Sequence, residues 1–280
     1  MNALEKIKKV FALVAGQQKK LAIFILENYK QAAFMTSTNL AIASKVSPAT
    51  INRFCQQLGY KGYSDFQSDL QALLQNELTA LDRVENPADQ KFSLEKVWVS
   101  EINALNQSLK RISLESYSTA LDLLAGARNI YIVGHQACGP VALYAAYCLS
   151  KVRSHVERFD MGALDCLGMI NSFGTEDVAL VFNMPRYPIK TIQALQNLKK
   201  AGVKIVMVAH SELCENVQLA DALLVLPVCY HQFADGLSPL ISLVNALALD
   251  LYKRDEVEGK RCLEIFEKNS MFFFGGTQRN

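Results

Sequence analysis

The chain has 280 residues and a formal net charge of +2, with half of its residues hydrophobic and a fifth charged. This composition is typical of a globular protein and excludes a disordered chain, and the length suits two domains or one large one. The apolar runs "ALLVLPV" and "LISLVNALALDL" are too short or too interrupted to span a bilayer. The amphipathic start "MNALEKIKKVFALVAGQQKK" lacks the apolar core and cleavage site of a secretion signal. We therefore expect a soluble, cytoplasmic protein with no membrane partner.

The seven cysteines are scattered and contain no C-x-x-C pair, which argues against a disulfide framework and against a zinc knuckle. We expect them to be buried free thiols. On paper, metal ligands are available from four residues: His135, Cys138, His210 and Cys214. Their spacing matches no known zinc cage, so the sequence predicts no metal and no other cofactor.

Residues 1–77 show helical periodicity throughout and carry nine basic and five acidic side chains, a net charge of +4. Since the whole chain carries +2, the remaining residues sum to −2. A basic N-terminal part on a slightly acidic body suits a polyanionic partner at one end of the molecule.

Two short helices are predicted within 37–58. The first, in "STNLAIASK", has Ser37 or Thr38 as its N-cap. "KVS" forms a turn, and Ser47 then caps a second helix with Pro48 at its first position, where a missing N–H costs nothing. In "PATINRFCQQLG", apolar residues recur at three- and four-residue spacing and form a buried side, and Gly59 ends the helix in a left-handed conformation. The predicted buried residues are Ile51, Phe54, Cys55 and Leu58.

Two helices joined by a tight turn, the second exposing threonine, asparagine, arginine and glutamine, are typical of a helix-turn-helix. Arginine pairs with guanine in a major groove and asparagine or glutamine pairs with adenine, while Lys61 is suited to a phosphate and Tyr60 and Tyr63 to packing. The alternative is a helical bundle with a solvated polar face. The candidate DNA-binding residues are Ser47, Ala49, Thr50, Asn52, Arg53, Gln56, Gln57 and Lys61.

A polar, proline-containing stretch at 78–92 indicates a linker, and the helical pattern resumes over about 93–125. Short β-branched runs then alternate with helical stretches, which predicts a parallel sheet covered on both faces. The runs are "NIYIVG", "HVERF", "VALVFN", "VKIVMVAH" and "ALLVLPV", and the helices are 139–151, 189–200, 213–219 and about 237–253. Asp235 or Ser238 is expected to cap the last of these helices.

The segment "SKVSPATINRFCQQLGYKGYSDFQ", with "QQKKLAIFILEN" and "TSTNLA" upstream, resembles the N-terminal domain of the RpiR family of bacterial transcription regulators. The resemblance implies an all-α helix-turn-helix domain followed by an α/β doubly wound parallel-sheet domain of the sugar isomerase (SIS) type, which acts as an effector sensor. We expect a helix-turn-helix domain at 1–77, a linker at 78–92, an SIS-like effector-binding and dimerisation domain at 93–255, and a C-terminal tail at 256–280.

The resemblance also locates a sensor site at the carboxyl ends of strands. In SIS domains the loop after the first strand resembles Gly-x-Gly-x-Ser. This chain has Gln136 in place of the second glycine and Cys138 in place of the serine. Their Ser-x-Ser-Gly-x-Thr cup is replaced by "NMPRYP", which is similar to a variant in some RpiR-like sensors. Arg186 offers a planar donor fork for a phosphate or a carboxylate. The candidate effector-binding residues are Gly134, His135, Gln136, Cys138, Asn183, Arg186, Tyr187 and His210.

Structural roles are the alternative for these side chains. Arg186 could form a salt bridge or a dimer contact, Tyr187 could pack in the interior, and His135 and His210 could lie in surface loops. At the level of function, we expect a regulator that binds double-stranded operator DNA as a homodimer or homotetramer and responds to a small anionic metabolite. A sugar-phosphate isomerase is the alternative, but both loops lack their hydroxyls and no catalytic acid/base pair stands out. His231 is a candidate catalytic residue for such an isomerase, but no glutamate stands near it before the helix. A helical adaptor is a third reading.

Overall fold

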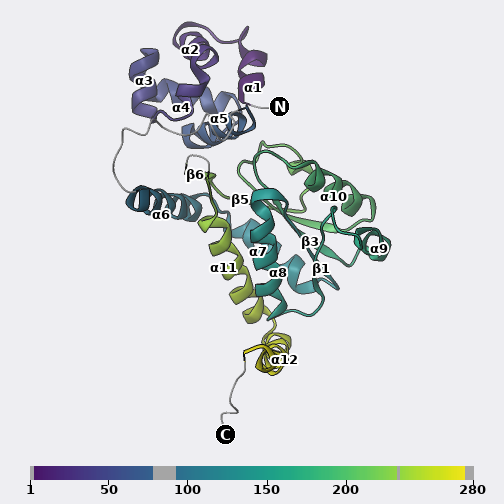
Figure 1. The fold of residues 1–280 in the computed structure, drawn as a ribbon. Coiled ribbons are helices and arrows are strands. Elements are labelled where there is room, and N and C mark those ends of the chain that lie inside the picture. Colours follow the sequence, from purple (N-terminus) through teal and green to yellow (C-terminus); the bar gives the residue numbers. More distant parts are fainter. Residues whose placement is uncertain (1–2, 78–92, 232–233, 275–280) are drawn as a thin grey trace.

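The computed structural model describes residues 3–77, 93–231 and 234–274, so the predicted linker 78–92 lies outside the described residues (Figure 1). Five helices form the N-terminal domain at one end of the molecule. They are α1 (Ala3–Val10), α2 (Gly16–Ala32), α3 (Ser37–Ser44), α4 (Pro48–Gln57) and α5 (Tyr63–Glu77). Among the helices that the structure describes, none combines the length and the apolar character needed to cross a bilayer.

Helices α3 and α4 form the predicted helix-turn-helix pair. The N-cap of α3 is Thr36, one residue before the predicted position, and its hydroxyl accepts a hydrogen bond from the Asn39 N–H at 3.2 Å. The predicted cap of α4 is confirmed, because the Ser47 hydroxyl accepts from the Thr50 N–H and a proline follows at the first helical position. Gly59 has φ +90°, which confirms the left-handed glycine after this helix.

The N-terminal core contains the predicted apolar side of α4. Ile51, Phe54, Cys55 and Leu58 are buried and pack against residues of α2, α3 and α5. Tyr60 and Tyr63 are buried as well, which confirms their predicted role as packing residues. A small helical domain thus builds a core of its own.

The second part of the chain begins with α6 (Ser93–Arg111) and α7 (Leu114–Gly126) and continues into a five-stranded parallel sheet of order β2-β1-β3-β4-β5. All five predicted strands are confirmed: β1 (Ile130–Val133), β2 (Val156–Arg158), β3 (Val178–Asn183), β4 (Lys204–Ala209) and β5 (Ala222–Val225). The predicted helices are confirmed at α8 (Gly139–Ser150), α10 (Ile189–Lys200) and α11 (Ser238–Arg254). The further elements are α9 (Cys166–Ser172), the antiparallel hairpin of β6 (Cys229–His231) and β7 (Ala234–Gly236), and α12 (Glu256–Phe274).

Helices lie on both faces of the sheet (Figure 1). Alternate strand residues belong to the two opposite packing clusters. Ile132 and Leu180 pack with α7, α8 and α11, while Tyr131 and Val181 pack with α9 and α10. Both faces of the sheet are therefore covered, as expected for the doubly wound class. Of the seven cysteines, all free, only Cys166 is half-buried and the others are buried, as expected.

Besides the N-cap of α3, two local predictions are wrong. Residues 213–219 do not form an α-helix, because Asn216 has φ +69° and only a 3-10 turn, η2 (Val217–Leu219), follows it. Neither Asp235 nor Ser238 caps α11, since the N-cap is Leu237 and no side chain bonds to it. Asp235 lies earlier, in β7, and its side chain faces a cavity instead.

Candidate functional site

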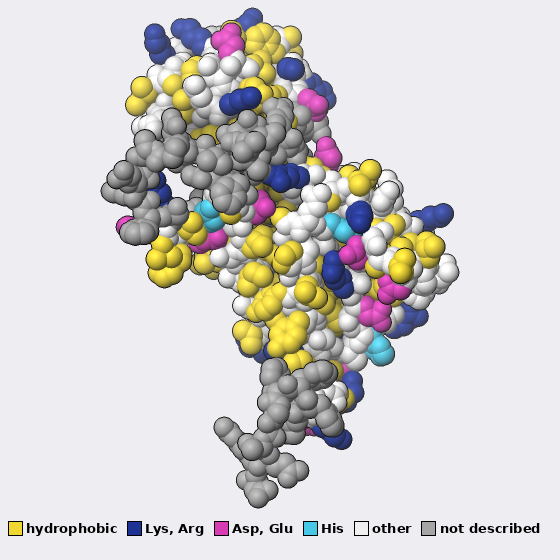
Figure 2. Space-filling model, in the orientation of Figure 1, with side chains coloured by type: hydrophobic (Ala, Val, Ile, Leu, Met, Phe, Trp, Pro, Cys, Tyr) yellow, Lys and Arg dark blue, Asp and Glu magenta, His cyan; other side chains and the backbone are white. Residues whose placement is uncertain are grey.

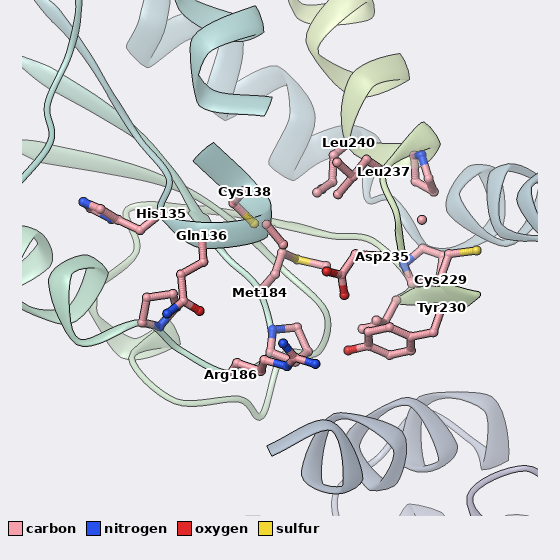
Figure 3. A pocket seen from close by; sticks show the side chains of 17 residues that line it. His135, Gln136, Cys138, Met184, Arg186, Cys229, Tyr230, Asp235, Leu237 and Leu240 are labelled. Atoms are coloured by element: carbon pink, nitrogen blue, oxygen red, sulfur yellow. The ribbon is translucent and has the colours of Figure 1, made fainter. Parts of the chain in front are cut away.

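A cavity of about 160 Å³ lies beyond the carboxyl edge of the sheet (Figure 3). Its walls come from the loop after β1, the loop after β3, and the β6–β7 hairpin with the start of α11. In a parallel α/β sheet this edge is the usual position of a ligand. The polar and sulfur-containing lining residues are His135, Gln136, Cys138, Met184, Arg186, Cys229, Tyr230 and Asp235.

The loop after β1 approaches its own helix closely. A Cβ atom on Gly134 would lie 2.6 Å from the carbonyl oxygen of Cys138, so only glycine fits there. Gln136 adopts φ +52°, an uncommon conformation for a residue with a side chain. Burial raises the pKa of the Cys138 thiol to about 12, so this group faces the cavity as a neutral thiol at physiological pH.

His135 contributes to the wall with its backbone, and its ring points away from the cavity (Figure 3). The ring lies 2.9 Å from the Thr191 hydroxyl through Nδ1 and 3.3 Å from the Asp160 carboxylate through Nε2. Burial lowers the pKa of this imidazole, and Asp160 only partly offsets that effect. The His135 ring therefore holds the loop in place through Thr191 and Asp160 and does not point at a ligand in the cavity.

The loop after β3 carries two consecutive non-glycine residues with positive φ, Arg186 at +75° and Tyr187 at +32°. Such conformations cost roughly 1–3 kcal/mol each and persist where the surroundings impose them. They turn the exposed Arg186 toward the cavity and its neighbour away from it. Asn183, at the end of β3, is fully buried and donates from Nδ2 to the Glu215 carbonyl at 2.7 Å.

Three helix N-termini meet at the cavity without a side-chain cap. The N-cap residues of α8, α10 and α11 are Cys138, Pro188 and Leu237; all three line the cavity, and none offers a capping hydrogen bond. By contrast, α3, α4 and α7 are each capped by a serine or threonine. The positive ends of the helix dipoles favour an anion at this place. Only some N–H groups are free there, because those of Cys138 and Gly139 bond to backbone carbonyls and Pro140 and Pro239 have none.

The opposite wall was not found by sequence reasoning. Tyr230 from β6 and Asp235 from β7 lie across the cavity from Arg186 (Figure 3). Burial raises the pKa of the Tyr230 phenol well above its usual value, so this group stays a neutral hydroxyl. The available signal was "ADGL" directly before α11, a polar step where another strand end meets a helix start.

Four of the eight predicted effector residues line the cavity: His135, Gln136, Cys138 and Arg186. The other four lie outside its lining: Gly134, Asn183, Tyr187 and His210. Gly134 allows the loop after β1 to approach Cys138 closely, and Asn183 bonds to the Glu215 carbonyl. The last two belong to a contact between the two domains.

That domain contact centres on His210 of the second domain and Asp69 of α5. Both are buried, and His210 Nε2 lies 3.6 Å from Asp69 Oδ1. On one side the His210 ring approaches the Tyr187 hydroxyl at 3.3 Å. On the other, Asp69 accepts a hydrogen bond from the Tyr60 hydroxyl and pairs with Lys6 Nζ at 3.7 Å.

The charge state of this contact follows from its partners. Burial alone would lower the pKa of His210, but Asp69 and Cys214 together outweigh burial and raise it to about 9. Burial likewise opposes the ionised form of Asp69, yet the nearby His210 ring and the hydrogen bond from Tyr60 hold the pKa of the carboxyl below its usual value. A buried imidazolium–carboxylate pair therefore joins the domains at neutral pH.

The candidate DNA-binding residues lie on α4 and in the segments that flank it. All are exposed except Thr50, which is half-buried and whose hydroxyl lies 2.9 Å from that of Ser47. Asn52 Oδ1 accepts from the Tyr63 N–H at 3.3 Å, and Lys61 is paired with Glu212 of the second domain. Lysine and arginine side chains are spread over the outer face of the N-terminal domain (Figure 2).

Comparison with known proteins agrees with this architecture. Residues 1–77 match the family profile described as "Helix-turn-helix domain, rpiR family", and residues 123–250 match the SIS domain profile. An HTH-type transcriptional regulator of Haemophilus influenzae is 24% identical over 230 residues, 80% of this chain and 79% of that one. HexR of Pseudomonas aeruginosa is 31% identical over 147 residues, 52% of each chain.

Two solved structures share the fold. The Vibrio vulnificus NanR protein complexed with ManNAc-6P has a TM-score of 0.61 and 21% identity, covering 98% of this chain and 100% of that one. The sugar isomerase domain of an RpiR transcription factor from Sphaerobacter thermophilus has a TM-score of 0.59 and 20% identity, covering 63% and 99%. With a helix-turn-helix domain of the rpiR type followed by an SIS domain, the chain belongs to the RpiR family of transcriptional regulators.

Proposed function

We propose that this regulator binds operator DNA through α4 and that its SIS domain senses a small anionic metabolite, which alters operator binding. The observation that carries the sensing role is the meeting of three uncapped helix N-termini and Arg186 at one cavity. Family membership supports the DNA-binding role. The relatives compared above are named as transcriptional regulators, which favours a regulator over an enzyme.

The chemistry of the cavity narrows the ligand class. Arg186 and the helix N-termini suit a phosphate or a carboxylate, whereas Asp235 on the opposite wall would repel a second anionic group and accept hydrogen bonds from hydroxyls. A sugar phosphate or a hydroxylated carboxylate has both features. NanR, a neighbour in fold, was solved with the sugar phosphate ManNAc-6P.

Coupling to DNA would run through the contact between the domains. Arg186, which would bind the anion, is followed directly by Tyr187, whose hydroxyl meets the buried His210. His210 contacts Asp69, and Asp69 accepts a hydrogen bond from Tyr60, the neighbour of Lys61. A ligand that straightens the strained loop would therefore bias one domain arrangement over another, which is a population shift.

Self-association fits the exposed face of α6. Three large apolar side chains recur at helical spacing there, with Trp98 62%, Ile102 57% and Leu109 79% exposed, and Leu114 at the start of α7 extends the stripe at 79%. Exposed apolar surface of this kind marks an interaction site. We infer that two chains pair through this face, so that two copies of α4 address two half-sites. In this proposal residues 1–77 bind DNA, residues 93–255 sense the ligand and dimerise, and the protein acts in the cytoplasm.

A thermal-shift screen tests the sensing role. Phosphorylated sugars, amino-sugar phosphates and small carboxylates would be added to the full chain, and a ligand that binds the folded state raises the melting temperature. Arg186→Ala is expected to lose that rise. Lys190→Ala is the matched control, because Lys190 is an exposed cation on α10 outside the cavity lining and should keep the rise.

Three outcomes would contradict the proposal. A rise that persists in Arg186→Ala would move the anion site elsewhere. A ligand that binds without changing affinity for operator DNA would separate sensing from regulation. Conversion of a sugar phosphate during the screen would favour the isomerase alternative.

A further inference from the structure

A second cluster of chemically reactive side chains lies behind the cavity wall. Glu101 projects from α6, while Cys229 and His231 come from β6. Glu101 Oε1 lies 2.8 Å from His231 Nε2, and that nitrogen lies 3.6 Å from the Cys229 sulfur. One ligand atom from each residue falls within 4.8 Å of the others.

The cluster is built into the fold. Cys229 is 6% exposed, and the side chains of His231 and Glu101 are 13% and 16% exposed. The second carboxylate oxygen of Glu101 is buried and has no hydrogen-bond partner, an arrangement that normally costs free energy. This unpartnered acceptor beside a thiol and an imidazole is available to a cation.

Gly236 on the facing strand β7 keeps this space open. A Cβ atom at that position would lie 2.7 Å from the Cys229 sulfur and 2.8 Å from Glu101 Oε1. Any residue other than glycine would therefore fill the point at which the thiol and the carboxylate converge. The hairpin thus leaves a small cradle between its own strands and α6.

We propose that Glu101, Cys229 and His231 bind a divalent transition metal of the zinc class, at a site that shares only Cys229 with the cavity lining and does not require the effector proposed above. A thiolate, an imidazole nitrogen and a carboxylate oxygen are the ligand types that Zn²⁺ prefers, and hard cations such as Mg²⁺ avoid the sulfur. Three protein ligands leave a fourth position for water or another donor. Upon binding, the thiol proton leaves to solvent, and the ring proton moves from His231 Nε2 to Nδ1 so that Nε2 ligates the metal.

The position of the site gives the metal a structural consequence. It would join α6, the first described helix after the segment 78–92, to the hairpin that carries Tyr230 and Asp235 of the cavity wall. A bound ion would hold that wall against α6.

Cobalt is the probe for this proposal. Full-length protein, stripped with a chelator and kept reduced, would be titrated with Co²⁺ while the thiolate-to-cobalt absorption is recorded. We expect one Co²⁺ per chain, displacement by Zn²⁺, and a higher melting temperature with either metal. Cys229→Ser should abolish the absorption. Cys138→Ser is the matched control, because it removes another buried thiol of the same cavity that lies outside the cluster, and it should keep the absorption.

His231→Gln protects the test against a folding defect in the cysteine variant. It retains the thiol but loses the imidazole ligand, and it should bind Co²⁺ at least about tenfold more weakly, while the metal-free protein still unfolds cooperatively. No thiolate absorption in the wild-type chain would overturn the proposal. An absorption that persists in Cys229→Ser, or is lost in Cys138→Ser alone, would also overturn it.

Discussion

Replacing His210 by glutamine is expected to remove a pH dependence from the contact between the two domains. The imidazole is fully buried against Asp69, and its pKa is raised from 6.5 to about 9. At about 1.36 kcal/mol per pKa unit, this rise corresponds to about 3 kcal/mol of stabilisation of the protonated imidazole by its surroundings, Asp69 and Cys214 together. Because no part of His210 is exposed, solvent screening does not reduce this figure.

The sign follows from the direction of the shift. A group whose pKa is higher in the folded protein contributes its stabilisation fully below pH 6.5 and loses it as the pH rises to about 9. The wild-type melting temperature should therefore exceed that of His210→Gln near pH 6.5, by about 6–12 °C if the whole 3 kcal/mol is expressed. By pH 9.5 the two proteins should melt at similar temperatures.

Calorimetry of both proteins across this pH range is the assay. Other groups face the pair. Burial lowers the pKa of Lys6, so the effect of Lys6 on stability changes with pH in the direction opposite to that of His210. The phenols of Tyr60 and Tyr187 stay neutral because burial raises their pKa values. The difference between wild type and variant isolates His210 from them. His155→Gln, at an exposed histidine, is the control and should follow the wild type. A difference that stays constant with pH, or grows toward pH 9, would refute the reasoning.

Three further substitutions test other parts of the structure. Arg53→Ala should weaken specific DNA binding about 5- to 150-fold without lowering the melting temperature, measured by binding to selected operator sequences; unchanged affinity would exclude α4 as the recognition helix. Gly134→Ala should cost roughly 1–3 kcal/mol, because its Cβ would meet the Cys138 carbonyl, while Gly126→Ala, with no atom within 4 Å, should cost nothing in urea unfolding. Phe54→Ala should cost about 3–5 kcal/mol by the same measurement, and a cost below about 1 kcal/mol would contradict its place in the core.

The elements that could be predicted from sequence are those encoded locally. Ser47 and Pro48 mark the start of α4 with two independent signals, and the strand runs such as "VALVFN" are apolar because both faces of the sheet are covered. The helix predicted at 213–219 was wrong because the apolar residues of this segment pack in two different clusters. Leu213 packs against the N-terminal domain and Cys214 against the sheet, so their spacing does not report a helix.

The site was predictable only where one loop supplies the residues. The loops after β1 and β3 follow strand ends, and Arg186 does line the cavity. Asp235 was expected to cap a helix, because the sequence cannot tell a capping carboxylate from one that faces a cavity. His231 was judged to lack a nearby glutamate, yet Glu101 contacts it from 130 residues away. Contacts across such separations depend on topology, which single-sequence patterns do not encode.

The ion pair between Lys61 and Glu212 has a consequence for ionic strength. While the lysine is paired with the second domain, it is not available to displace a counterion from a DNA phosphate. Each phosphate contact steepens the fall of log affinity with log salt concentration by about 0.9. Two domain arrangements that differ in this one pair therefore differ in their salt dependence as well as in their affinity. If Lys61 contacts DNA as proposed, an arrangement that breaks this pair would lose affinity more steeply with salt than one that keeps it.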